Sequence, residues 1–121
     1  MTSSAEYKDS ILELLEPLFP VRISRFFGGI GLSYDAVQFA MIMGNSLYFA
    51  VDEYTRKKYE RAGMQPFSYM AKRGRIQVRK YFELPEDVLN DPEQLRLWAH
   101  EAIQVAANTK KSKRRAKSDT P

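Results

Sequence analysis

Apolar residues recur along this chain with two different spacings, and the change between them outlines the predicted elements. Near the N-terminus they return every three or four positions, which favours a helix that ends at Pro17 and Pro20. Its stripe consists of Tyr7, Ile11, Leu14, Leu15 and Leu18. A last helix is expected after Asp91, Pro92 and Gln94, which suit its N-cap, N1 and N3 positions. Its stripe consists of Leu95, Trp98, Ala99, Ala102, Ile103 and Ala106.

Between these helices the apolar residues alternate or run together, as is typical of strands. The expected strands cover residues 21–27, 31–34, 37–43 and 46–51, with turns at Asp35-Ala36 and Gly44-Asn45. Glycine at the first position of a two-residue hairpin turn supplies the positive φ that this turn needs. Residues 37–43 are apolar on both faces, which predicts a strand in the middle of the sheet.

The second half of the chain is predicted to contain a capped helix and a β-hairpin. Asp52 is expected to cap a helix over residues 53–62, and Gly63 to end it. Strands over residues 67–71 and 75–82 are joined across "KRG". Their inner face is predicted to carry Phe67, Tyr69, Ile76 and Val78, and the other face Arg75, Gln77, Arg79 and Tyr81. The order α-β(4)-α-β(2)-α predicts an α+β fold with an antiparallel sheet.

Length and composition fit one intracellular domain. A chain of 121 residues is long enough to bury a single core. The absence of cysteine excludes disulfides and thiolate sites, which favours a cytoplasmic location. The start "MTSSAEYKDS" lacks the pattern of a secretory signal, and no apolar stretch is long enough for a membrane span.

The net charge of +4 is divided unevenly along the chain. Residues 1–108 contain 13 Lys and Arg against 14 Asp and Glu, whereas residues 109–121 contain 6 against 1. We therefore expect a nearly neutral domain over residues 1–108. The segment "TKKSKRRAKSDTP" has no apolar residue except Ala116, which predicts a disordered basic tail over residues 109–121.

The stretch "RFFGGIGLSYD" is rich in glycine and raises the question of a phosphate loop. A dinucleotide fingerprint requires that the glycines open a helix, and a P-loop requires a following lysine. Here a strand-like segment follows, without a lysine after the glycines. We interpret the motif as a tight turn or bulge, and alternatively as an edge that binds a partner. The candidate interaction loop consists of Phe26, Phe27, Gly28, Gly29 and Gly31.

No combination of residues predicts catalysis, a cofactor or a metal site. His100 is the one histidine and falls off the apolar stripe of its helix, so helical spacing builds no ligand set around it. Asp52 and Glu53 are explained by capping and by the helix dipole. We therefore expect a protein that is not an enzyme, with an enzyme of unrecognised site as an alternative.

Two basic features are candidates for binding. The tail could neutralise phosphates in weak, sequence-independent and salt-dependent contact with nucleic acid, or serve only as a solubilising segment. Its candidate contacts are Lys110, Lys111, Lys113, Arg114, Arg115 and Lys117. The predicted outward set Arg22, Arg75, Arg79 and Tyr81 could form a basic, aromatic face of the sheet, although a solvated face is the simpler interpretation.

Three segments in order resemble the N-terminal domain of the TfoX/Sxy family of bacterial competence regulators. These are "EPLFPVRISRFFGGIGLSYD", "SLYFAVDEYTRKKYERAGMQPFSY" and "YFELPEDVLNDPEQLRLWAHEA". Together they extend the resemblance over residues 7–107. The recurring elements of the family correspond to Phe27-Gly28-Gly29, Gly31, Leu47-Tyr48, Val51-Asp52, Gly63-Met64, Pro66-Phe67, Tyr81 and Leu84-Pro85.

The resemblance implies a two-layer α+β domain, similar in topology to type III secretion chaperones, without catalytic residues. Full-length members resemble co-activators that work with a cyclic-AMP-dependent transcription activator and carry a second, C-terminal domain. This sequence has only the basic tail after Asn108, which predicts a stand-alone N-domain protein. We expect a protein-interaction module in transcription regulation, with a protein partner and a homodimer as the fold analogy suggests. The alternative is a nucleic-acid-binding accessory protein that acts through its tail.

Overall fold

The computed structural model describes residues 5–26 and 28–118, with side chains described as far as Lys110. The elements in chain order are α1 (Ala5–Leu15), β1 (Arg22–Phe26), β2 (Gly29–Tyr34), β3 (Val37–Met43), β4 (Ser46–Ala50), α2 (Arg56–Arg61), β5 (Pro66–Ala71), β6 (Gly74–Glu83), α3 (Glu86–Leu89) and α4 (Pro92–Ser118). The predicted order is confirmed, with the one-turn helix α3 as an addition. No helix in the described part of the chain is both long and apolar enough to cross a membrane.

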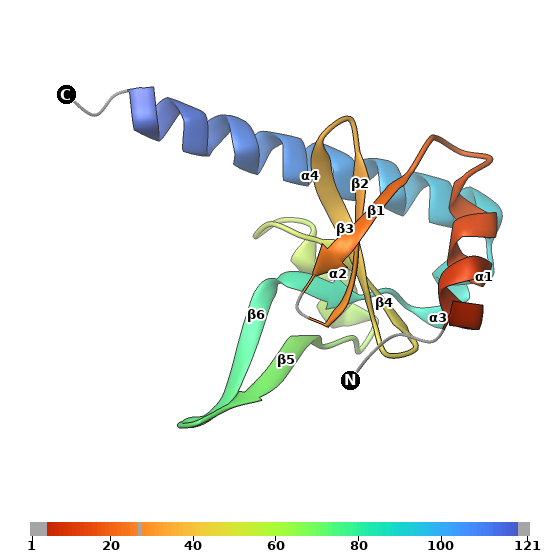
Figure 1. Ribbon diagram of the computed structural model, residues 1–121, viewed down its shortest axis with the longest axis horizontal. Coiled ribbons are helices and arrows are strands. Elements are labelled where there is room, and N and C mark those ends of the chain that lie inside the picture. Colours follow the sequence, from red (N-terminus) through yellow and green to blue (C-terminus); the bar gives the residue numbers. More distant parts are fainter. Residues whose placement is uncertain (1–4, 27, 119–121) are drawn as a thin grey trace.

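The six strands form one antiparallel sheet in the order β1-β2-β3-β4-β6-β5. The predicted α+β class is therefore confirmed, and β3 lies inside the sheet as its two-sided apolar pattern indicates. Figure 1 shows the long α4 helix crossing the sheet, with α1 and α3 beside its N-terminal half. The β5–β6 hairpin extends away from these helices.

One face of the sheet packs against the helices and forms the hydrophobic core. The strand residues Leu32, Ala40, Ile42, Phe49 and Phe82 belong to this core. The helices contribute Ile11, Leu15, Val88, Leu95, Ala99, Ala102 and Ile103. Among the described residues the buried side chains are all of hydrophobic type, and they include the phenol-bearing Tyr59. This covered face therefore stabilises the domain through apolar burial.

Local turn and cap signals have the predicted effect. Met43 pairs with Ser46 across Gly44-Asn45, and Tyr34 pairs with Val37 across Asp35-Ala36. Asp52 Oδ1 accepts hydrogen bonds from the amides of Tyr54 at 3.0 Å and Thr55 at 2.8 Å. Regular helix nevertheless begins at Arg56, three residues later than predicted, because residues 53–55 form the capped turn. The predicted stop at Gly63, with φ of 81°, is confirmed.

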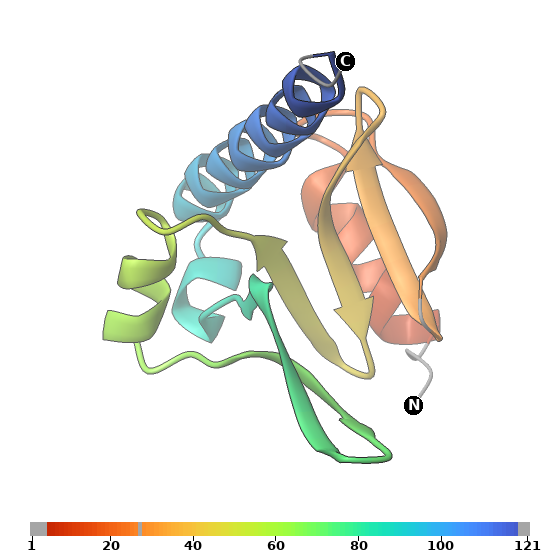
Figure 2. The same cartoon turned by 90° about the vertical axis from the view of Figure 1, so that its left-hand side faces the viewer.

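The sheet is strongly curved on its open side. Phe26 on β1 and Tyr81 on β6 bring their ring centroids within 6.3 Å, although β2, β3 and β4 lie between their strands. In a flat sheet strands four positions apart are separated by about 19 Å. The uncovered face must therefore be concave, and Figure 2 shows the strong twist of the sheet that accompanies this shape.

The C-terminal segment differs from its prediction. We expected residues 109–121 to be disordered, whereas α4 continues through residues 109–118; residues 119–121 lie outside the described residues. Lysine, arginine and alanine are good helix formers, and they extend a helix that the domain has already nucleated. Figure 1 shows this end of α4 extending past the sheet. Lys110 Nζ donates a hydrogen bond to the carbonyl oxygen of Ala36 at 3.1 Å.

Candidate functional site

The glycine-rich motif builds the curved edge of the sheet. Gly28 has a φ of 81° and lies between the paired residues Phe26 and Gly29, so the predicted tight turn is confirmed. The second strand begins at Gly29, two residues earlier than predicted, so Gly29 and Gly31 belong to β2 and not to a loop. The motif precedes a strand, which removes the geometry of a phosphate-binding helix N-terminus.

Neighbouring atoms approach Gly29 and Gly31 of β2 so closely that a side chain would not fit at either position. A Cβ on Gly29 would overlap the sulfur of Met43 and the carbonyl oxygen of Ile42. A Cβ on Gly31 would lie 2.5 Å from Gln38 Oε1. Without side chains at these two positions, Met43 and Gln38 can lie across β2 on the concave side. The glycines therefore let the sheet close toward its own open face.

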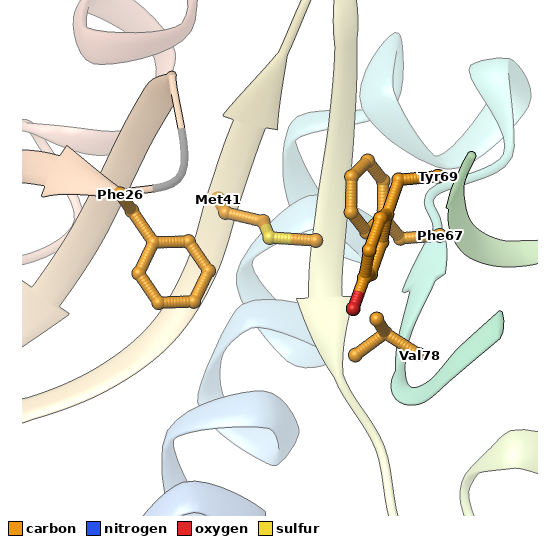
Figure 3. Close-up of a pocket in the computed structure, with 5 residues that line it drawn as sticks. All are labelled: Phe26, Met41, Phe67, Tyr69 and Val78. Atoms are coloured by element: carbon orange, nitrogen blue, oxygen red, sulfur yellow. The ribbon is translucent and has the colours of Figure 1, made fainter. Parts of the chain in front are cut away.

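This open face contains an apolar pocket of ≈ 600 Å³, which we call the cleft. Figure 3 shows its five lining side chains, which come from four strands and point toward a shared space. They are Phe26, Met41, Phe67, Tyr69 and Val78. Met41 forms the floor, because it lies on the opposite side of β3 from the core residues Ala40 and Ile42. A volume of this size is in the range of binding pockets.

Aromatic contacts hold one wall of the cleft in place. The rings of Phe67 and Tyr69 stack with centroids 6.2 Å apart, and Tyr48 meets Phe67 edge-on at 5.4 Å. Next to Phe26, the Tyr81 hydroxyl accepts a hydrogen bond from Gln38 Nε2 at 3.2 Å. Burial raises the pKa of Tyr81, so its hydroxyl stays neutral at physiological pH. The wall is therefore preformed and uncharged.

The hairpin that supplies this wall corrects one expectation. Phe67, Tyr69, Ile76 and Val78 do share a face, since Phe67 pairs with Val78 and Tyr69 with Ile76. That face was predicted to point inward, but Tyr69 is 46% exposed and Ile76 is 43% exposed. Alternation identifies a face but not whether another layer covers it. The predicted inner face is an open wall.

The strands around the cleft are strongly basic. Together with the β5–β6 turn, the six strands carry seven exposed cations and one acid, Glu83. We call these seven the sheet cations: Arg22, Arg25, Lys72, Arg73, Arg75, Arg79 and Lys80. None of them takes part in the ion pairs found among the described side chains. The sheet therefore keeps an uncompensated positive field.

The predicted basic face is only partly assembled. Arg75 donates to Ser68 Oγ at 2.8 Å on the outer side of the hairpin. Arg79 lines a separate polar pocket with Glu60 and Gln77. Tyr81 instead lies beside Phe26. The sheet is basic, but these side chains do not form one aromatic-basic surface.

The remaining predicted site residues are dispersed. Phe27 lies outside the described residues, so the candidate interaction loop is seen only at Phe26 and the glycines. The predicted nucleic-acid contacts fall on the end of α4, where the side chain of Lys110 is described and those of Lys111, Lys113, Arg114, Arg115 and Lys117 are not. His100 is exposed, and its ring meets that of Phe19 edge-on with centroids 5.7 Å apart. Among the described side chains, no cluster of three or more histidine or acidic residues could hold a metal.

The fold places this chain in a class of small two-layer α+β domains with one helix-covered and one open sheet face. The chain belongs to the TfoX N-terminal domain family, whose profile matches residues 13–106. The resemblance seen in the sequence is thus confirmed over nearly the whole domain. The membership supports a competence-regulator-like module. No curated protein matches the chain.

Proposed function

We propose that this protein is a non-enzymatic interaction module of transcription regulation that binds a protein partner in the cleft. The observation that carries the proposal is the preformed apolar space on the helix-free face, whose wall residue Tyr69 is 46% exposed and whose floor, Met41, is fully buried. Exposed apolar surface that is contiguous and concave is costly in water and is typical of binding sites. Family membership supports a regulatory role.

The apolar character of the cleft favours a protein segment over a charged metabolite. None of the described residues that line it is charged, and the nearby Tyr81 hydroxyl already has Gln38 as a hydrogen-bond partner. A charged or polar group buried against Phe26, Met41, Phe67 or Val78, away from the Tyr69 hydroxyl, would lack a strong hydrogen-bond partner, at a cost of about 1–3 kcal/mol or more. Aliphatic or aromatic side chains of a partner would instead gain free energy by leaving water.

Site-specific photocrosslinking tests this function. A photoreactive phenylalanine analogue replaces Tyr69 in the cleft wall or, as a control, Leu97, which is 54% exposed on α4. In nuclease-treated extracts of the native cell, we expect a defined protein adduct from position 69 and none from position 97. Equal labelling from both positions, or no adduct at position 69, would contradict a protein-binding cleft.

A pair of charge substitutions then distinguishes docking from a loss of folding. Val78→Glu places a carboxylate in the cleft, whereas Gln77→Glu places one on the outer side of the same hairpin strand. We expect Val78→Glu to abolish the adduct at position 69, while Gln77→Glu retains it. Circular dichroism should show that both variants remain folded, because both positions lie on the half-open hairpin.

A further inference from the structure

We infer that the occupant of the cleft is an acidic segment of a partner protein, with apolar side chains that enter the cleft between its carboxylates. The inference rests on the proposed function and specifies its partner. It is carried by the juxtaposition of an apolar cleft with uncompensated cations on the strands that line it. Electrostatic complementarity of this kind selects partners and steers their association.

Exposed cations lie beyond two opposite walls of the cleft, on the strand that carries Phe26 and on the turn that follows Tyr69. On β1, Arg22 and Phe26 share a face because alternate residues of a strand point to the same side. At the other edge, Lys72 and Arg73 form the turn of the hairpin whose inner wall carries Tyr69. A segment lying across Met41 would therefore have positive charge at both of its ends. Arginine and lysine clusters are a known mode of recognition for acidic motifs.

The sheet is basic, and so are the sequences of α2 and of the end of α4. The helices α1 and α3 on the covered side have the opposite character, with Glu6, Asp9 and Glu13 against Lys8, and with Glu86 and Asp87. These acids are not paired with the sheet cations. The positive field at the cleft is thus left for a partner, and like-charge repulsion among the cations decreases when an anionic segment binds.

The lining favours a peptide over a nucleic acid. Bases carry donors and acceptors that need partners when they are buried, and Met41 and Val78 offer none. The stacked pair Phe67–Tyr69 uses one face of each ring, which leaves fewer ring faces on which bases could stack. A leucine or phenylalanine side chain meets neither difficulty. The sheet cations would then contact carboxylates and not phosphates.

Selection from a random peptide library tests the inference directly. The library displays segments of about twelve residues, which reach about 40 Å when extended. Binders are selected on the intact protein and depleted on the uncharged Val78→Gln variant, so that cleft-dependent segments remain without a bias from an added charge. We expect these segments to contain at least two large apolar residues and more Asp and Glu than Lys and Arg. Neutral or basic cleft-dependent segments would overturn the inference and leave the proposed function standing.

Matched charge reversals give a second readout. Arg22→Glu/Lys72→Glu removes cations beside the cleft, and Lys57→Glu/Arg61→Glu makes the same change in net charge on the exposed side of α2. We expect the first pair to weaken binding of a selected peptide by about tenfold, and the second by less than about twofold. The affinity should also fall between about 0.15 M and 0.5 M salt. Equal effects of the two pairs would contradict the inference.

Two other occupants are distinguished in the same experiments. Binding of a single-stranded oligonucleotide that is lost in Val78→Glu would overturn the inference in favour of nucleic acid. Self-association that rises with concentration in sedimentation and is lost in Val78→Glu would assign the cleft to a second copy of this chain. Failure to recover any cleft-dependent peptide, together with no adduct at position 69, would contradict the proposed function itself.

Discussion

Both faces of the sheet carry apolar side chains, yet only one of them is covered by helices. On the covered face Phe49 is fully buried and packs against Phe39, with ring centroids 6.1 Å apart. On the open face Tyr69 stacks on Phe67 but remains 46% exposed. The same residue types therefore serve two purposes: those of the covered face hold the fold, and those of the open face remain available to a partner.

The two faces of the sheet also differ in the charged groups around them. Among the described residues of the covered side, none of charged type is buried as a whole, although Glu101 Oε1 and Arg56 Nε are buried atoms. The open face has an uncharged floor, but exposed cations lie on the strands around it. An apolar surface without charge would invite nonspecific association, whereas charged neighbours limit its partners. Substitutions on the two faces should therefore change different properties.

The largest effect is expected from the covered face. Phe49→Ala removes a fully buried ring and should lower the free energy of unfolding by about 3–5 kcal/mol. Tyr69→Ala on the open face should lower it by less than about 1 kcal/mol, because the side chain is half exposed. Urea unfolding measures both values. Similar losses for the two variants would show that the faces do not differ as described.

A smaller effect is expected where the sheet closes on itself. Gly29→Ala adds a Cβ that overlaps the carbonyl oxygen of Ile42, which is backbone and cannot rotate away. We expect a loss of about 1–3 kcal/mol in unfolding free energy. The control Ser33→Ala on the same strand adds no atom and should change stability by less than about 0.5 kcal/mol. If Gly29→Ala were as stable as the native protein, the role assigned to Gly29 in the curvature of the sheet would be contradicted.

A still smaller contribution comes from the contact between α2 and α4. Lys58 Nζ lies 2.6 Å from Glu101 Oε1 and 4.1 Å from the ring centroid of Trp98. Removing a partly exposed ion pair and cation–π contact with Lys58→Ala should cost about 1 kcal/mol. Thermal or urea unfolding measures this loss, and binding of a cleft peptide should be unchanged. A loss of peptide binding would instead show that the contact between α2 and α4 affects the cleft.

The weakest effect at neutral pH concerns Tyr59 in the core. Burial raises the pKa of Tyr59 well above its ordinary value near 10, with a further contribution from Glu101. The folded state therefore favours the protonated phenol, and this part of the stability is complete below pH 10 and lost as the pH rises toward the folded pKa. The free energy of unfolding, measured from pH 7 to above pH 10, should fall more steeply for the native protein than for Tyr59→Phe. Parallel curves would contradict this assignment.

The sequence predicts the elements of this fold better than it predicts their surroundings. Turns and caps depend on a few neighbouring residues, so Gly44-Asn45, Asp52 and Gly63 could be placed correctly. The role of Gly29 depends on Met43 and Ile42, which approach it only after β3 pairs with β2. Sequence spacing could not reveal that contact.

The cleft escaped prediction for a similar reason. Phe26 and Phe67 are 41 positions apart and come to line one cleft only because the sheet curves. Alternation placed Phe67, Tyr69, Ile76 and Val78 on one face, but the covering of that face depends on where the helices pack. The signal that could have found the cleft is the combination of this aromatic face with the many cations of the same hairpin. The helical end of α4 escaped prediction because composition alone does not register helix propagation.

The central claim is that a partner binds on the concave face over Met41, and methionine methyl NMR tests it most directly. Met41 lies on the floor of the cleft, whereas Met64 lies in the connection before β5 and serves as an internal control. On addition of a selected acidic peptide, the account predicts a shift of the Met41 methyl signal that saturates with peptide, while the Met64 signal stays in place. A bound peptide that leaves the Met41 signal unchanged would contradict the account.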